Sequence, residues 1–356
     1  MQTNDNLTKH AEFLKHAMAN LPLVTDDLPG IGGEIKRAPE HFEVEEILPY
    51  APCGEGEHVF VRLRRKLWNT ADVAAQLAQC FGLPPVDVGW AGRKDKQAVT
   101  TQTFSLHLPM SMPMSDISSR LATLPFEILG IERHRNKIKT GHVAGNRFKI
   151  IVSEVPQSSL ATAEDIAAAI RKRGVPNFYG EQRFGFDGAN IMHGLRMATA
   201  GRASRKKKDL LIVSALQSAL FNVWLAQRMA RCQYDTILLG DVVQKRDTGG
   251  MFVVQDLNDA SERFAAGAIV YTGPMYGPKM RSAENVAADH ELHLLQQFDL
   301  SLDSFKALKS PGTRRQAALK IDDLNLSDHA MGLQFQFTLP PGAYATVVMR
   351  EFLRPA

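Results

Sequence analysis

Cysteine is scarce in this chain of 356 residues, and long apolar runs are lacking. The three cysteines, Cys53, Cys80 and Cys232, match neither a disulfide framework nor the paired spacing of a zinc site. No run approaches the roughly 20 apolar residues that cross a bilayer, and the N-terminal segment is polar where a signal peptide is apolar. We therefore expect a cytoplasmic protein without a membrane segment.

The usual signatures of cofactor chemistry are also missing. The sequence has no Gly-Lys-Ser/Thr phosphate loop, no Gly-x-Gly-x-x-Gly between a strand and a helix, and no His-x-Glu with a Cys-x-x-Cys. Nucleotide-driven, dinucleotide-dependent and zinc deaminase chemistries thereby lose their usual sequence support. We expect a reaction carried by side chains, with no cofactor and no metal.

What the chain does have is enough apolar material for a core and an uneven distribution of cations. Hydrophobic residues make up 44% of the sequence, and the length suffices for two domains. The net charge is only +4, yet residues 133–149 hold six Lys or Arg and no acid, and residues 202–208 hold five more. Such blocks are usually solvated surface; two of them in one chain make a polyanionic partner a reasonable hypothesis.

The spacing of apolar residues predicts an alternation of strands and helices. Leu14, Met18 and Leu21 indicate a short appended helix followed by a hinge, and the helix from Thr70, which can cap it, should end at Gly82. A break at Gly174 marks a plausible domain junction. Strands are expected at 58–64, 86–91, 102–108, 126–131, 147–152 and 334–339, and further helices at 161–172, 213–232 and 344–353.

Three segments could carry chemistry. AGRKDKQAVTTQTFS (91–105) surrounds Asp95 with three cations in a connection between strands, and these cations can keep a carboxylate ionised. RHRNKIKTGHVAGNRF (133–148) combines cations with Asn146 and Phe148, which suit phosphates, a base edge and base stacking. GVPNFYGEQRFG (174–185) is rich in turn formers and aromatics. Taken singly, the first and third favour a structural turn, and for the second a basic hairpin is an equal alternative.

In this order the segments resemble the TruD family of tRNA pseudouridine synthases over nearly the whole chain. The resemblance rests on KRAPEHF (36–42), GEGEH (54–58), WNT (68–70), AGRKDKQAVT (91–100), GNRF (145–148), VPN (175–177) through QRFG (182–185), SALFN (218–222) and ATVVMRE (345–351). Three departures are His41 where the family often has Asp, Phe178-Tyr179 in inverted order, and Tyr344 where Phe is common. None of them touches Asp95.

The resemblance implies an α/β (α+β) protein with the pseudouridine synthase fold, a mixed, mainly antiparallel sheet, and an inserted second α/β domain. Residues 1–25 would be an N-terminal extension, 26–175 and 325–356 the catalytic domain, and 176–324 the inserted domain. A groove lined by the basic segments would hold the RNA.

The implied activity is isomerisation of uridine to pseudouridine in tRNA, with uridine 13 as the characteristic bacterial target. By family match Asp95 is the catalytic residue, and Phe42, Asn146, Tyr344, Phe148 and Lys36 bind the substrate. We expect a monomer whose partner is tRNA, with no small-molecule cofactor. Two alternatives stay open: an RNA-binding or RNA-folding protein acting without catalysis, and a metal-dependent nuclease, which would need more acids than this motif offers.

Overall fold

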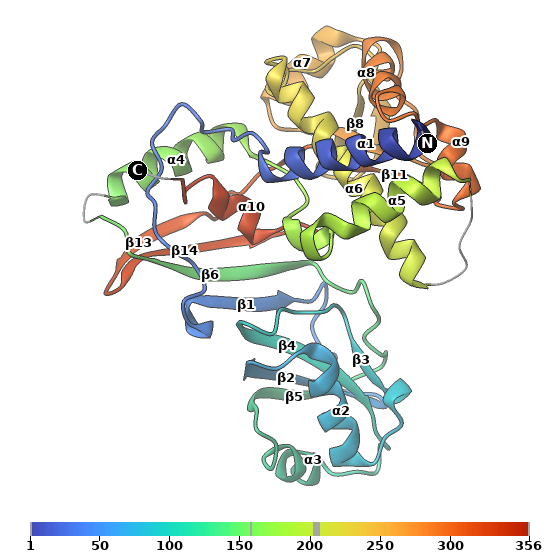
Figure 1. The fold of residues 1–356 in the computed structure, drawn as a ribbon. Coiled ribbons are helices and arrows are strands. Elements are labelled where there is room, and N and C mark those ends of the chain that lie inside the picture. Colours follow the sequence, from blue (N-terminus) through green and yellow to red (C-terminus); the bar gives the residue numbers. More distant parts are fainter. Residues whose placement is uncertain (1, 157–158, 202–206, 355–356) are drawn as a thin grey trace. The chain divides into compact units, whose positions relative to one another are not determined.

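The computed structural model describes residues 2–156, 159–201 and 207–354 and divides the chain into two compact units. Unit 1 comprises residues 1–26, 172–320 and 346–351, and unit 2 comprises residues 27–171, 321–345 and 352–356. Figure 1 shows the elements of each unit along the chain. The two units are described separately below.

Unit 2 is built on an eight-stranded mixed sheet. The strand order is β13-β14-β6-β1-β4-β2-β5, with β3 paired to β4; β1 and β4 run parallel, and the other pairs are antiparallel. The strands are β1 (Phe42–Ile47), β2 (His58–Lys66), β3 (Val88–Trp90), β4 (Val99–His107), β5 (Glu127–His134), β6 (Gly145–Ser153), β13 (Asn325–His329) and β14 (Gly332–Leu339). The expected mixed, mainly antiparallel sheet is confirmed.

Two helices bury apolar side chains on one face of this sheet. Unit 2 contains α2 (Thr70–Phe81) and α3 (Met114–Leu121), and α4 (Ser159–Arg173) leads from unit 2 into unit 1. Val61, Leu63 and Phe104 from the sheet share one buried cluster with Leu77 of α2 and Leu121 of α3. Full burial of such side chains contributes roughly 1.5–3 kcal/mol each. This cluster fixes the β2-β4 pair, and the loop that carries Asp95 ends where β4 begins, at Val99.

The ends of α2 follow from local sequence, with one correction to the expectation. Asn69, and not Thr70, is the N-cap: its side chain accepts a hydrogen bond from the amide of Asp72 at 2.9 Å. Gly82 ends the helix with φ 65°, a left-handed conformation that glycine adopts without steric cost. Thr70 is thereby released for another role, because its hydroxyl is buried among polar groups of the sheet.

Unit 1 combines a four-stranded sheet of order β11-β10-β8-β9 with a two-stranded β12-β7 ladder. Its strands are β7 (Val175–Pro176), β8 (Val242–Lys245), β9 (Met251–Val253), β10 (Ile269–Met275), β11 (Thr313–Gln316) and β12 (Ala318–Leu319). Its helices are α1 (Gln2–Ala19), α5 (Ala189–Thr199), α6 (Lys207–Ala230), α7 (Leu257–Ala265), α8 (Asn285–Gln296) and α9 (Leu302–Ala307). Three-stranded or larger sheets covered by helices in this way can form an independent core.

The long helix α6 is the central helix of unit 1. Its segment Asp209–Ala230 is long and apolar enough to cross a membrane by length and composition, contrary to the expectation that no segment is. However, 72% of its most apolar window is buried inside the fold. Apolar residues all round a helix are typical of a buried core helix as well.

The terminal segments group differently from the expected domains. Leu14, Met18 and Leu21 are buried, and α1 packs against α5 and α6, so residues 1–26 belong to the core of unit 1. Near the C-terminus, α10 covers only Ala345–Arg350, shorter than the helix expected over 344–353. The carboxylate of Glu351 accepts a 2.7 Å hydrogen bond from the Thr25 hydroxyl, which ties 346–351 to unit 1.

Candidate active site in unit 2

Asp95 lies in the loop between β3 and β4 of unit 2, as its sequence context predicts. Strand β3 pairs antiparallel with the far half of β4, so the chain must return along the sheet before β4 begins at Val99. The β3-β4 ladder therefore holds the start of the loop, and the pairing of Val99 with Glu43 of β1 and Lys66 of β2 holds its end. The Asp95 side chain is 46% exposed, which leaves it accessible to a substrate.

The nearest cation to the Asp95 carboxylate comes from a distant part of the sequence. Lys36 Nζ donates to Oδ2 of Asp95 at 2.8 Å, and the amide of Gln97 donates to Oδ1 at 3.1 Å. Burial raises the pKa of Asp95, but the Lys36 hydrogen bond and the amides of Gln97 and Lys96 outweigh it. The net pKa of Asp95 therefore lies below its ordinary value, and the carboxylate is ionised at neutral pH.

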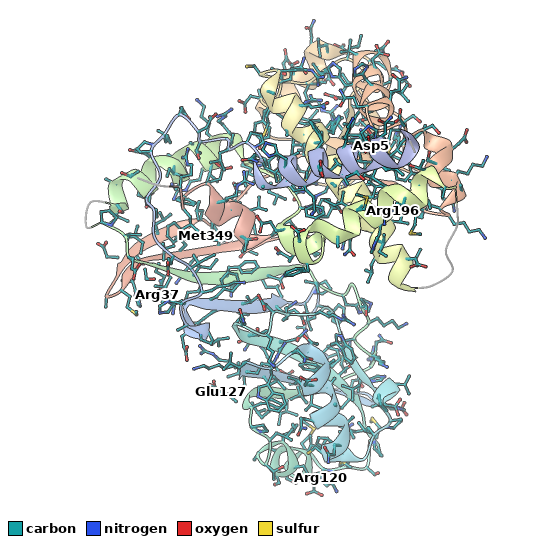
Figure 2. All side chains as sticks on the ribbon, viewed as in Figure 1. Asp5, Arg37, Arg120, Glu127, Arg196 and Met349 are labelled. Carbon is teal, nitrogen blue, oxygen red and sulfur yellow. The ribbon has the colours of Figure 1, made fainter. Side chains whose placement is uncertain are left out.

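The backbone at Lys36 adopts an unusual conformation. Its φ is 62°, in the left-handed region that side chains other than glycine rarely adopt. The next residue, Arg37, labelled in Figure 2, pairs with Glu34 and Glu154 of the same unit. A strained residue held by its neighbours and aimed at a carboxylate is typical of functional sites.

Aromatic side chains extend the site from Lys36 along the sheet. Lys36 Nζ lies 4.4 Å from the centre of the Phe42 ring, a cation-π contact. The rings of Phe42 and Phe148 meet edge to face at 6.0 Å, and Phe148 stacks on Phe337 at 5.6 Å. Phe42 and Phe148 are 5% and 8% exposed, so they form a wall more than a free stacking surface.

Asn146 completes this wall from β6. It stands two residues before Phe148, on the same face of the strand, and pairs directly with Glu46 of β1. Its side-chain oxygen is buried and has no hydrogen-bond partner among the described residues. Buried acceptors without donors are rare in native proteins and call for a specific explanation.

A family model described as tRNA pseudouridine synthase D (TruD) matches residues 19–197 and 193–352 of the chain. The chain belongs to the TruD family of tRNA pseudouridine synthases. These enzymes are isomerases.

Named relatives agree over almost the full length. The tRNA pseudouridine synthase D of Anaeromyxobacter dehalogenans strain 2CP-C is 42% identical over 95% of this chain and 97% of its own. A counterpart from Thermus thermophilus is 39% identical, covering 94% of this chain and 92% of its own. The crystal structure of the TruD protein from Methanosarcina mazei has the same fold, with a TM-score of 0.76 at 22% identity over 95% of this chain and 97% of that one.

The structure adds a buried polar network that sequence reasoning had missed in this TruD member. Lys94 Nζ donates to Oε2 of Glu46 at 2.6 Å, and both side chains are almost fully buried, at 8% and 0% exposure. Gln102 Nε2 donates to the same oxygen at 3.1 Å and to the carbonyl of Gly92 at 2.7 Å. These bonds fasten the catalytic loop to β1 immediately before Asp95.

The network continues to the start of α2. The Thr70 hydroxyl accepts a hydrogen bond from the backbone amide of Lys94 at 3.0 Å and donates one to Oε1 of Gln102 at 3.2 Å. Arg65 donates to both Gln102 and Thr70, at 3.1 and 3.0 Å, and burial lowers its pKa to about 10 although Glu46 opposes this. Every donor and acceptor position of the Gln102 amide is thus filled. These bonds hold the Gln102 amide in one orientation.

Tyr344 lies in the same unit, half-buried, one residue before α10. Lys36, Phe42, Phe148 and Asp95 are joined by the contacts above, with Asn146 two residues from Phe148. The place of Tyr344 beside them stays a prediction.

The first basic block proves to be largely partnered. Arg133 donates to three backbone carbonyls, and Arg135, Arg147 and Lys149 pair with the acids Glu55, Glu45 and Glu43. Exposed ion pairs of this kind contribute at most about 1 kcal/mol each, so phosphates can compete for these cations. The second block lies in residues 202–208, outside the described side chains.

The loop at 174–185 serves packing in unit 1. The Asn222 side chain accepts a hydrogen bond from the backbone amide of Tyr179 at 2.8 Å and donates one to the backbone carbonyl of Tyr179 at 3.0 Å. The Arg315 guanidinium lies 3.9 Å from the centre of the Tyr179 ring. These contacts favour the structural interpretation of this motif.

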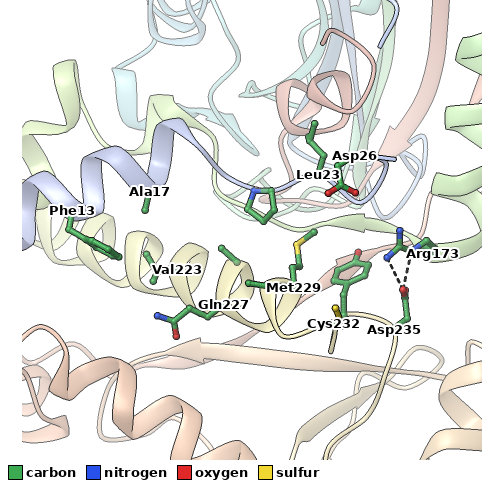
Figure 3. Close-up of a pocket in the computed structure, with 14 residues that line it drawn as sticks. Phe13, Ala17, Leu23, Asp26, Arg173, Val223, Gln227, Met229, Cys232 and Asp235 are labelled. Atoms are coloured by element: carbon green, nitrogen blue, oxygen red, sulfur yellow. Dashed lines mark hydrogen bonds and ion pairs between the residues drawn. The ribbon is translucent and has the colours of Figure 1, made fainter. Parts of the chain in front are cut away.

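Unit 1 also contains a cavity of about 590 Å³ between α1 and α6 (Figure 3). Phe13 and Val223 contribute to its largely apolar wall, and Arg173 pairs with Asp235 at 2.8 Å on its rim. No group of His, Cys, Asp and Glu that could hold a metal occurs among the described residues.

Proposed function

We propose that this chain isomerises uridine to pseudouridine in tRNA, with uridine 13 as the target and Asp95 as the catalytic residue. Membership of the TruD family supports the activity. One observation carries the assignment of Asp95: its carboxylate is ionised and half exposed in the loop before β4, and it lies 2.8 Å from Lys36 Nζ.

The reaction needs a group that either adds to the ribose or removes a proton from it, and it needs no oxidant or reductant. The N1 to C1′ bond breaks, the uracil turns over, and C5 bonds to C1′; one proton leaves C5 and one is gained at N1. An ionised aspartate can act by adding to the ribose or by removing a sugar proton. Both routes require Asp95 to be anionic and within reach of the sugar, and both proceed without a cofactor.

Substrate capture falls to the residues around Asp95. The target base must leave its stack, which costs a few kcal/mol that pocket contacts and backbone binding repay. Phe42, Phe148 and Tyr344 would contact the extruded nucleotide, and Asn146 would read a base edge. Lys36 would hold Asp95 in its ionised form. The protein would act as a cytoplasmic monomer with tRNA as its partner.

The decisive test is release of tritium from 5-tritiated uridine in tRNA, because only bond formation at C5 expels that proton. The wild type should release it, and Asp95→Asn should release none while keeping its fold and tRNA affinity. Asp116→Asn, which changes an exposed acid on α3, is the matched control. Pseudouridine mapping with and without the protein then tests the position.

Each negative outcome has a separate meaning. Measurable turnover by Asp95→Asn would remove Asp95 from the mechanism. Salt-sensitive tRNA binding without tritium release by the wild type would instead favour an RNA-binding or RNA-folding protein. Loss of activity on adding a chelator would contradict a reaction carried by side chains alone.

A further inference from the structure

Two buried acceptors without donors lie side by side in the candidate site. Oε1 of Glu46 and Oδ1 of Asn146 are both buried and have no hydrogen-bond partner among the described residues. The two residues are direct cross-strand partners in the β1-β6 ladder, so their side chains leave the sheet on the same face. An acceptor pair of this kind is suited to a ligand that brings N–H groups.

The orientation of Glu46 is fixed by its other oxygen. Oε2 accepts from Lys94 at 2.6 Å and from Gln102 at 3.1 Å, and the side chain is 0% exposed. Turning the carboxylate to satisfy Oε1 would break both bonds. Because an ionised carboxylate can only accept, Oε1 selects a donor.

Side-chain contacts and short stretches of backbone connect these acceptors to Asp95 in both directions. Lys94, bonded to Glu46, precedes Asp95 in the chain, and Lys36 links Asp95 to the Phe42 ring. The Phe42 ring meets Phe148, which stands two residues from Asn146 on the same face of β6. The path returns from Asn146 to Glu46 through the ladder.

We propose that Glu46 Oε1 accepts the N3–H of the extruded uracil, which makes Glu46 a specificity-determining residue, and that Asn146 Oδ1 accepts the second ring N–H, which N1 gains once its bond to C1′ has broken. This deepens the proposed function and rests on it. Uracil carries a hydrogen at N3, whereas cytosine presents a lone pair there and would face the carboxylate with no donor at that position. Uridine offers only the N3–H, whereas pseudouridine carries hydrogens at both N1 and N3, so both acceptors are satisfied once the product has formed.

The test measures preference for the base and not only rate. In an Asp95→Asn background that cannot turn over, dissociation constants are compared for two tRNA transcripts, with uridine or cytidine at the position first located by pseudouridine mapping. The shared phosphate backbone cancels in the ratio. We expect the parent to prefer uridine about tenfold or more, and Glu46→Gln, which places an amide N–H at Oε1, to abolish that preference.

The matched control is Glu45→Gln, the neighbouring acid on the opposite face of β1, whose carboxylate pairs with Arg62 and Arg147. It should keep the preference for uridine. If Glu46→Gln does not fold, Glu46→Gln combined with Lys94→Met contains no buried charge at this pair and supports the same comparison. A merely structural role for Glu46 would lower stability or rate and leave the ratio unchanged.

Two results would overturn the proposal: a parent that binds both transcripts equally, or a ratio that Glu46→Gln leaves within twofold of the parent value. The tritium assay tests the proposed function separately. If the wild-type protein releases no tritium, the proposed function is wrong, whatever the ratio of the two dissociation constants.

Discussion

Replacing Lys94 by Met tests whether the catalytic loop is held by its buried ion pair. The substitution removes the charge that faces Glu46 but keeps most of the side-chain volume. Glu46 is then left as a buried carboxylate with a single hydrogen bond, the 3.1 Å contact from Gln102. The backbone amide of Lys94, which donates to Thr70, is unaffected.

The expected loss of stability follows from burial of both partners. Removing one member of a buried ion pair costs about 3–5 kcal/mol, because the remaining charge stays desolvated. Since Gln102 still donates a hydrogen bond to Glu46, we expect a loss at the lower end of this range, about 3 kcal/mol. For a unit of this size that corresponds to a fall in Tm of about 6–12 °C. Adding Glu46→Gln removes the stranded charge and should recover most of this loss.

The assay is thermal or urea unfolding of the full chain, monitored together with single-turnover pseudouridine formation. We expect Lys94→Met to lose activity beyond what its folded fraction explains, because the residue before Asp95 is no longer anchored to β1. A Tm within 2 °C of wild type would refute the reasoning about the buried pair. So would a double variant that is less stable than Lys94→Met.

Two further substitutions probe the substrate side of the site. Lys36→Met removes the main group that lowers the pKa of Asp95, so burial is less opposed, and the acid limb of the kcat/KM profile should move to higher pH; a slower enzyme with an unmoved limb would contradict this. Asn146→Ala should slow single-turnover chemistry about 10-fold or more while changing tRNA affinity little, because phosphate contacts dominate binding. An affinity loss at an unchanged rate would count against it.

Sequence periodicity predicted six of the eight strands of unit 2, and it missed β1 and β13. Burial alternates along β14, as it does in a strand with one buried face, whereas seven of the nine residues of β4 are buried. The small sheet of unit 1 gave no such signal. All seven residues of β10 are buried, and a Gly and a Pro lie within it, so neither alternation nor propensity indicates a strand.

The candidate site was predictable only as far as local motifs reach. Asp95 and Asn146 lie in segments whose composition suggests a catalytic or RNA-binding role, and the family resemblance assigned both residues to one active site. Glu46 was missed because no strand was predicted over residues 42–47. Its burial depends on the parallel pairing of β1 with β4 and on Lys94, 48 residues further along, and periodicity contains neither fact.

The order of strands in unit 2 has a consequence for synthesis on the ribosome. Strand β6, which carries Asn146 and Phe148, pairs on one side with β1 and on the other with β14, made from residues 332–339. Until those last residues emerge, β6 is an open edge with unpaired amides and carbonyls, available to other nascent chains. The wall of the site is therefore among the last parts to be sealed, and C-terminal truncation should release an aggregation-prone chain and not a smaller enzyme.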